Sequence, residues 1–387
     1  MRKTFLPYCR PHVDEGDVAS VVDALRNHWL TTGPKARAFE DRFAELTGAR
    51  HAVGLNSATA GIHLALVALG VGPGDEVVLP SLSFVSAANC VRHCGALPVF
   101  CDVEPDTLCL SVRSVDAVVT ERTKVVVSMP YSGRPVGIGA LRAYTRGRGI
   151  ALIEDAALGV GTLDAGRWPG SESDAAIFSF YATKNLTTGE GGMLVTNDDD
   201  LADRVRRLAL HGMDRDAWKR YAAGGTWRYD VTMTGYKYNL PDMAAALGLA
   251  QLDKLAVMQE RRAQIAARYC EAIASIAGIG VAALGRMGSL DRHSWCFFPI
   301  AVDEGAGLSR DEVVVAMREA NIGTSVHYIP SHLFTAYAQG DHDLPNTEQA
   351  WAQLISLPLF PSMSDQDVED VLEALAGAVE RVSASVA

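Results

Sequence analysis

The stretch FSFYATKNLTTGEGG, residues 178–192, places a single lysine just beyond an apolar run. Phe178, Ser179 and Phe180 end that run, Lys184 follows among small and polar residues, and glycines close the stretch. In open parallel sheets, ligands bind beyond the carboxyl ends of the strands. The lysine is therefore either a surface charge on a loop or a reactive amine held in a pocket, and the surrounding sequence decides between the two.

Short apolar runs alternate with helix-like runs from about residue 50 to residue 200. The runs are apolar throughout rather than at every second residue, which is typical of strands buried on both faces of a mostly parallel sheet. We therefore predict an α/β fold, with helices on each side of a central sheet. The runs are HAVGLNS (51–57), DEVVLP (75–80), LPVFCDV (97–103), KVVVSM (124–129), IALIED (150–155), AAIFSF (175–180) and GMLVTN (192–197).

The pattern changes after TGYKYNLPD, residues 234–242. Residues 243–276 predict one long amphipathic helix, and a strand-like SWCFFPIAV and two further helical patterns follow. This order indicates a second, smaller α+β domain. We predict a large domain over residues 1–245 and a smaller C-terminal domain over 246–387, which includes the connecting helix.

The bulk composition excludes several classes of protein. The chain has 387 residues, 48% of them hydrophobic and 21% charged, as in ordinary globular proteins. Its net charge of -11 argues against nucleic acid or an anionic membrane as the main partner. No apolar run reaches the ~18 residues of a transmembrane helix.

The seven cysteines form no CxxC pair, which indicates buried thiols rather than a metal site. With no signal peptide in view, we expect a cytoplasmic protein.

Four features follow the ends of the predicted strands. Ala58 and Thr59 open a helix, where free backbone N–H groups can cradle a phosphate. Phe84 can cover a flat ring, Asp155 is an acid at the end of a buried strand, and Lys184 is an amine. Each feature alone has an ordinary explanation, such as a helix cap or a core side chain. Together they match the needs of pyridoxal phosphate, which requires a phosphate cradle, a ring cover, an acid for its pyridine nitrogen and a lysine.

Several longer blocks of the chain point to one family. They are WLTTGPKARAFE, NSATAGIHLAL, GPGDEVVLPSLSFVSAANCV, IEDAA, FSFYATKNLTTGEGGMLVTND, GYKYNLPDMAAALGLAQLDKL and LPNTEQAWAQLISLPLFPSMSD. The chain resembles, over nearly its whole length, the DegT/DnrJ/EryC1/StrS sugar aminotransferases, which have the aspartate-aminotransferase fold (fold type I). Among the subgroups, TTGPK, GYKYNL and LPNTE look most like enzymes that aminate C4 of a nucleotide-linked 4-keto sugar.

The resemblance implies a role for each cofactor-binding residue. Lys184 matches the lysine that forms a Schiff base with pyridoxal phosphate and moves the proton during transamination. Asp155 matches the acid that pairs with the pyridine nitrogen, and Phe84 matches the aromatic residue that stacks on the ring. The positions that match phosphate-binding residues are Ala58, Thr59 and Ser179. L-glutamate is the implied amino donor, with pyridoxamine phosphate formed on the way to the nucleotide keto-sugar.

The resemblance also implies a homodimer with shared active sites. In the family, the loop that matches GYKYNL reaches the active site of the neighbouring subunit, so Asn239, with Lys237, is expected to contact the partner's phosphate. Five further residues are candidates for substrate contact, although a structural role in a loop explains each of them equally well. They are Thr32, Tyr181, His327, Tyr328 and His332.

Two positions depart from the family pattern. The family reads EDAAH or EDAAQ where this chain has Leu158, and the usual side chain donates a hydrogen bond to the phenolic oxygen of the cofactor. Leucine cannot donate, so we predict that the lysine-bound cofactor titrates differently here. Pro130 stands where close relatives of the C4-aminating group often carry histidine, which weakens the assignment to that subgroup.

Other activities compete with C4 amination. The ketone could instead be C3 of a 3-keto sugar or a cyclitol ketone. A dehydratase relative would carry histidine in place of Lys184, and a non-catalytic regulator would be expected to lose Lys184 or Asp155. Both residues are retained, which favours a transaminase.

Overall fold

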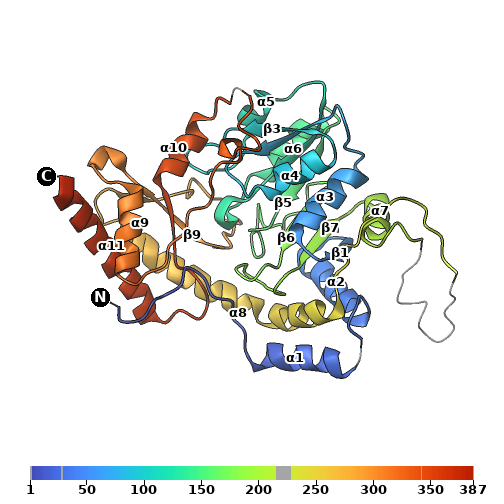
Figure 1. Ribbon diagram of the computed structural model, residues 1–387, viewed down its shortest axis with the longest axis horizontal. Coiled ribbons are helices and arrows are strands. Elements are labelled where there is room, and N and C mark those ends of the chain that lie inside the picture. The colour runs from blue at the N-terminus through green and yellow to red at the C-terminus, as the bar shows by residue number, and fades with distance from the viewer. Residues whose placement is uncertain (1, 28, 215–227, 341, 387) are drawn as a thin grey trace.

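The computed structural model describes residues 2–27, 29–214, 228–340 and 342–386, and it contains a large and a small α/β unit (Figure 1). The large unit is built on a seven-stranded sheet of order β1-β7-β6-β5-β4-β2-β3. Only β7 runs against its neighbours, so the predicted mostly parallel sheet is confirmed. The strands are β1 (His51–Leu55), β2 (Glu76–Pro80), β3 (Leu97–Cys101), β4 (Thr123–Ser128), β5 (Ala151–Asp155), β6 (Ala175–Ser179) and β7 (Gly192–Thr196).

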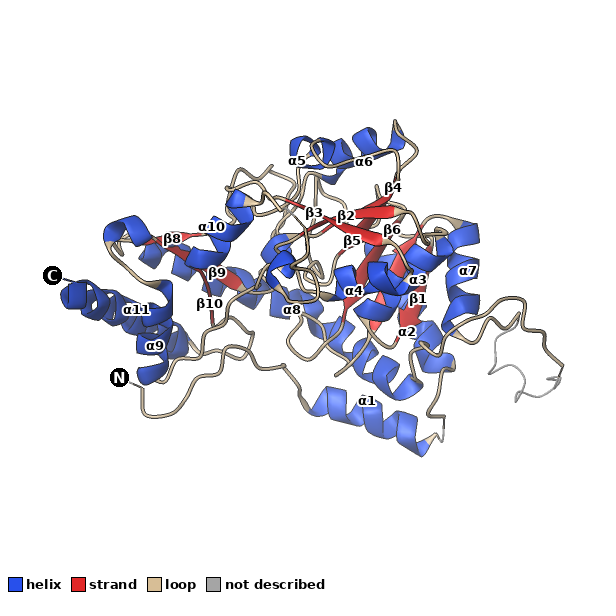
Figure 2. Ribbon diagram, turned by 45° about the horizontal axis from the view of Figure 1, so that its top comes forward, coloured by secondary structure: helices blue, strands red, loops and turns tan. Residues whose placement is uncertain are grey.

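Helices cover both faces of this sheet, as its apolar strands require (Figure 2). One face packs against α3 (Ala58–Ala68), α4 (Ser86–His93) and α7 (Asp199–Ala209). The other packs against α2 (Pro34–Thr47), α5 (Val112–Asp116), α6 (Ile138–Arg146) and the first half of α8 (Asp242–Ile273). The central strands β2, β6 and β7 are buried at every residue. The carboxyl ends of the parallel strands β2 and β6 therefore emerge from a fully buried core at one edge of the sheet.

The long helix α8 runs from the large unit into the small one, and α1 (Glu15–Arg26) packs along its outer side (Figure 1). The predicted helix over 243–276 is thus present with slightly different ends. The N-terminus of α1 is fixed by a capping box, in which Asp14 accepts hydrogen bonds from the amides of Gly16 and Asp17.

The small unit is built on an antiparallel sheet of order β10-β9-β8. Its core contains side chains from α8 together with Leu6 of the N-terminal segment, which forms a β-bridge with Ile322. The domain boundary at 245/246 falls inside α8 and stays a prediction. The remaining elements are β8 (Ile279–Val281), β9 (Phe298–Val302), β10 (Leu354–Leu357), α9 (Arg310–Glu319), α10 (Pro345–Gln353) and α11 (Asp365–Val386).

All seven cysteines are free thiols. In the described ranges, no helix is long and apolar enough to cross a membrane. Nor do three or more His, Cys, Asp or Glu side chains in those ranges gather as a metal site would require.

Candidate active site

The ends of β5 and β6 bring Asp155 and Lys184 to one edge of the large sheet. Asp155 is the last residue of β5 and is only 4% exposed. Lys184 lies half-buried in the loop between β6 and β7, where its amide donates to the carbonyl of Tyr181 at 2.9 Å. Burial raises the pKa of Asp155 to about 6, while the positive charge of Lys184 acts in the opposite direction. The amine and the carboxylate therefore interact electrostatically.

Asp155 lacks the partner that a buried carboxylate needs. Its one hydrogen bond comes from the amide of Ala157 at 3.2 Å, and no basic side chain in the described ranges forms an ion pair with it. The adjacent Glu154 is different, because it accepts hydrogen bonds from Gly170 N at 2.8 Å and Ser173 Oγ at 2.7 Å. An unpaired buried charge is costly. The protonated nitrogen of a pyridine ring would supply the missing partner for Asp155, so this residue fits the cofactor.

The three candidate phosphate-binding residues lie around one contact between β7 and α3. Ser57 caps α3, with its Oγ accepting a hydrogen bond from Ala60 N at 3.1 Å, and Ala58 and Thr59 follow in the first turn. Ser179, at the end of β6, pairs with Gly192 in β7. A β-carbon at Gly192 would lie 2.6 Å from the nitrogen of Ala58, so only glycine permits this approach. The positive end of α3 and the Ser179 hydroxyl thus offer hydrogen-bond donors that fit a phosphate.

Phe84 lies after the end of β2 and leaves 58% of its surface exposed. Its ring centroid is 6.1 Å from that of Tyr328, and the two planes are tilted by 58°. Burial raises the pKa of Tyr328, and the charge of Asp155 raises it further. Because β2, β4 and β5 run parallel, Phe84 after β2 and Asp155 at the end of β5 lie at the same edge of the sheet, and the exposed ring of Phe84 is free to cover a flat ligand.

His327 also belongs to this region. Its Nδ1 lies 2.8 Å from Ser356 Oγ, and its ring stacks on Phe297 at a centroid distance of 4.3 Å. Burial, followed by the nearby charge of Lys184, lowers the pKa of His327 to about 3. The imidazole is therefore neutral near pH 7 and could meet a substrate only as a neutral hydrogen-bonding group.

The N-terminal segment closes this side of the site, which the sequence patterns did not reveal. The ring of Tyr8 lies 5.3 Å from that of His327, and Cys9 Sγ lies 3.5 Å from the carbonyl oxygen of Thr183, next to Lys184. Nothing local in the sequence around these residues signals a distant contact.

Thr32 and Asn239 bind each other within one chain. Asn239 Nδ2 donates to Thr32 Oγ1 at 2.5 Å, and Thr32 Oγ1 donates to the carbonyl of Leu240 at 2.6 Å. Lys237 donates to Asn239 Oδ1, so the loop is held together by side chains. A β-bridge between Asn239 and Leu55 places the loop beside the end of β1, just before α3.

The comparison with protein families agrees with this geometry. The model of the DegT/DnrJ/EryC1/StrS aminotransferase family matches residues 11–376. The chain belongs to this family.

Known relatives of this aminotransferase cover almost its whole length. The spore coat polysaccharide biosynthesis protein SpsC of Bacillus subtilis is 46% identical over 97% of both chains. DesI, solved in the presence of its TDP-sugar product, is 33% identical with a TM-score of 0.88, over 98% of this chain and 94% of DesI. Spr1654 of Streptococcus pneumoniae, a candidate sugar aminotransferase solved in its PLP form, is 31% identical with a TM-score of 0.88, over 98% and 99% of the two chains.

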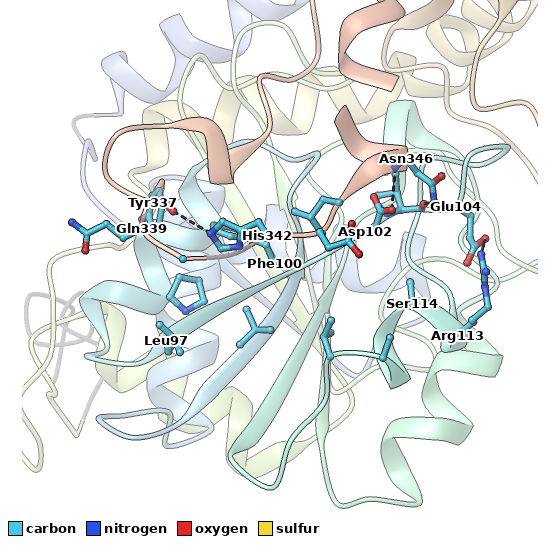
Figure 3. A pocket seen from close by; sticks show the side chains of 18 of the residues that line it. Leu97, Phe100, Asp102, Glu104, Arg113, Ser114, Tyr337, Gln339, His342 and Asn346 are labelled. Carbon is cyan, nitrogen blue, oxygen red and sulfur yellow. Dashed lines mark hydrogen bonds and ion pairs between the residues drawn. The ribbon is translucent and has the colours of Figure 1, made fainter. Parts of the chain in front are cut away.

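His332 of this aminotransferase is buried, and both of its ring nitrogens already have partners within the chain. It is 5% exposed, and its ring nitrogens lie 2.7 Å from Ser81 Oγ and 3.2 Å from Glu348 Oε1. Its ring centroid is 5.6 Å from that of His342. His342 lines a hollow of about 700 Å³ along the edge strand β3 (Figure 3).

This hollow is lined by none of the residues predicted for the active site. Two of its charged groups are paired with each other, since Arg113 forms an ion pair with Glu104 at 2.7 Å. Asp102 accepts a hydrogen bond from the amide of Asn346 at 3.1 Å (Figure 3) and another from the amide of Thr347 at 2.8 Å. We assign the hollow no part in the aminotransferase site.

Leu158 follows Asp155 by three residues and is 2% exposed. Its side chain packs in an apolar cluster with Tyr131 and Phe297, while its carbonyl accepts a hydrogen bond from Ser294 Oγ at 2.8 Å. Position 158 of the aminotransferase thus contributes apolar packing, and its side chain offers no hydrogen-bond donor.

Proposed function

We propose that this protein transfers the amino group of L-glutamate to a keto group, at C4, of a nucleotide-linked keto-deoxysugar. The observation that carries the proposal is the buried carboxylate of Asp155, which has no ion-pair partner in the described ranges and interacts with the charge of Lys184. The chemistry of aminotransfer follows from the family. The name of SpsC, which refers to polysaccharide biosynthesis, and the TDP-sugar product of DesI support a nucleotide sugar as the acceptor.

The predicted cofactor is confirmed by the family and by its solved members, since Spr1654 is known in both PLP and PMP forms. When bound, pyridoxal phosphate supplies an aldehyde that links to amines and a ring that accepts electrons. In our proposal, Asp155 holds the ring nitrogen in its protonated form, and Phe84 covers one face of the ring. The first turn of α3 and the hydroxyl of Ser179 hold the phosphate.

Lys184 is the proposed catalytic residue. Its amine would hold the cofactor between turnovers. As a free base, the same amine would take the proton from the α-carbon of the amino donor, and in the second half of the reaction it would give a proton to the sugar carbon that receives the amino group. The reaction needs no external oxidant, because glutamate becomes 2-oxoglutarate as the ketone of the sugar becomes an amine. Lys184 is half-buried, and burial keeps the nearby His327 imidazole neutral near pH 7, so that ring adds no positive charge next to the amine.

We further propose that two copies of the chain form the functional unit, and that Lys237 and Asn239 of each copy reach the site of the other. Large apolar side chains stand exposed on α1, on α8 and in the segment between α1 and α2, and they support this proposal because two copies could bury them against each other. They are Val18 (47% exposed), Leu25 (44%), Leu30 (48%), Met243 (38%) and Val257 (73%).

The acceptor can be identified by assaying the purified holoenzyme with L-glutamate and a panel of ketones. The panel contains 4-keto and 3-keto sugars linked to dTDP, UDP or GDP, together with a cyclitol ketone. We expect the highest kcat/KM with a 4-keto sugar nucleotide and a product aminated at C4. Preferred turnover of a 3-keto sugar or a cyclitol would contradict C4 amination. If glutamate converts the cofactor and no sugar nucleotide is aminated, the proposed acceptor class is wrong.

A further inference from the structure

Asn185, the residue after the catalytic lysine, joins three separate parts of the chain. Its side chain is 3% exposed. Its Nδ2 donates to the carbonyl of Ser294 at 2.7 Å, to the carbonyl of Val160 at 3.2 Å and, more weakly, to Gln259 Oε1 at 3.4 Å. The orientation of the amide is fixed by these partners, because the reverse orientation would set its oxygen against carbonyl oxygens.

The bond to Val160 fixes the loop that follows Asp155. The same carbonyl also accepts a hydrogen bond from Gln259 Nε2 at 2.5 Å, so α8 and Asn185 hold this loop from two directions. The Gln259 side chain lies directly against Gly161, because a β-carbon there would come within 1.8 Å of Gln259 Nε2, and a larger residue would displace this side chain. The loop after Asp155 is therefore bound at the carbonyl of Val160 by both Asn185 and Gln259.

The bond from Asn185 to Ser294 connects it indirectly to the same loop after Asp155. Ser294 Oγ donates to the carbonyl of Leu158 at 2.8 Å, and Ser294 N donates to the carbonyl of Gly133 at 3.0 Å. Gly133 must lack a side chain, since a β-carbon there would lie 1.9 Å from Ser294 Oγ. Asn185 thus connects the lysine loop to the acid loop directly through Val160 and indirectly through Ser294.

We propose that Asn185 is a positioning residue that sets the place of the Lys184 amine relative to the Asp155 carboxylate. The two groups act on opposite parts of one small ring, so a shift between their loops misplaces the amine. Asn185 Oδ1 is buried and has no hydrogen-bond partner among the residues that the structure describes, which is unfavourable for stability. The hydrogen bonds that Asn185 Nδ2 donates explain why an amide side chain stands here even though its oxygen is unpaired. The inference rests on the proposed roles of Lys184 and Asp155, and not on the identity of the sugar.

The test compares Asn185→Ala with Thr187→Val. Thr187 is a matched control, because it lies in the same loop and is also 3% exposed. Its Oγ1 donates to Phe180 O at 3.2 Å and accepts from Gly189 N at 3.0 Å, so both of these bonds stay inside the lysine loop. The variants are compared by amide hydrogen exchange of the cofactor-free protein, and by kcat and KM of the holoenzyme for L-glutamate.

We expect Asn185→Ala to speed exchange in residues 155–162 as well as in 178–192, and to lower kcat about tenfold or more with little change in KM. Thr187→Val should affect exchange in 178–192 alone and leave kcat within about twofold of the wild type. Normal kcat in Asn185→Ala, or normal exchange in 155–162, would overturn the proposal, as would equal losses of kcat in the two variants. If Asn185→Ala does not fold, Gln259→Leu provides the same measurement from the other side of Val160.

The exchange experiment separates this inference from the proposed function. It needs neither cofactor nor acceptor, so coupled exchange of the two loops is measurable even if no keto sugar is aminated. Failure of the sugar panel with coupled exchange intact would refute the acceptor and leave the positioning role standing.

Discussion

Gly192 and Ser57 touch through their backbones: a β-carbon at Gly192 would lie 2.5 Å from the carbonyl carbon of Ser57. The strand that follows the lysine loop is thereby seated against the start of α3, and Ser179 is its neighbour in the sheet. One residue without a side chain thus sets how closely the two halves of the proposed phosphate cradle approach.

We predict that Gly192→Ala weakens binding of pyridoxal phosphate by about tenfold or more, because the added carbon must push β7 and α3 apart. The measurement is an absorbance titration of the cofactor-free protein. Gly139→Ala in α6 is the control, since a β-carbon there meets nothing within 4 Å. Equal affinity in wild type and Gly192→Ala would show that the cradle does not depend on this contact.

We predict that Asp155→Asn changes how the stability of the cofactor-free protein depends on pH. Burial raises the pKa of Asp155 to about 6, so the folded state holds a proton that the unfolded state releases near pH 4. The stability linked to this proton is complete below about pH 4 and is lost as the pH rises through 6, an effect of about 3 kcal/mol. Asparagine carries no charge, so the variant should be the more stable protein at pH 8.

Chemical denaturation at pH 4 and pH 8 measures this effect. The buried Glu154, whose pKa burial raises to about 7, is present in both proteins and cancels from the difference. With cofactor added, the wild type should be more stable than Asp155→Asn at pH 8, since asparagine cannot form the ion pair with the ring nitrogen. A stability difference between wild type and variant that is the same at both pH values would contradict the assigned pKa.

We predict that Lys184→Ala abolishes turnover while leaving the fold intact, because one side chain serves as both nucleophile and proton carrier. Cofactor should still bind, and dialysis should remove it, since no covalent link forms. Lys124→Ala is the control: Lys124 forms a surface ion pair with Asp75 at 3.1 Å, and its loss should leave kcat unchanged. Substantial turnover by Lys184→Ala would refute the proposed mechanism.

Much of the fold and the cofactor site could be predicted because both depend on strands. Strands buried on two faces read as apolar runs, and their carboxyl ends meet at one edge, which brings Asp155 and Lys184 together. The direction of β7 could not be predicted, since an apolar run looks the same in either direction. Its antiparallel pairing is what brings Gly192 against α3.

The contacts that complete the site could not be predicted from local patterns. Cys9 meets Thr183, and Asn185 meets Ser294, across separations of 174 and 109 residues. An asparagine after a lysine fits a surface loop as well as a buried junction, and only the folded structure distinguishes the two. His332 shows the opposite case, because a residue in a motif associated with substrate is held between Ser81 and Glu348.

We predict that specific activity falls when the enzyme is diluted below the dissociation constant of its dimer, because Lys237 and Asn239 are proposed to complete the partner's site. Sedimentation or light scattering over the same concentration range gives the oligomeric state. Val257→Asp should shift the loss of activity to higher protein concentration, since Val257 is 73% exposed on α8. The control is Val315→Asp, because Val315 is 57% exposed on α9 of the small unit. Constant activity in a monomeric preparation would exclude shared sites.

We predict that Leu158→Gln shifts the absorbance titration of the lysine-bound cofactor to lower pH, because an added donor stabilises the negative charge of the phenolic oxygen. The same change places an amide among Tyr131 and Phe297, so some loss of thermal stability should accompany it. Leu158→Met separates the two effects, since it keeps the volume of the side chain and adds no donor. Its titration should match the wild type. An unshifted titration in Leu158→Gln would mean that other groups already fix the charge of that oxygen, and that leucine at this position has no effect on the cofactor.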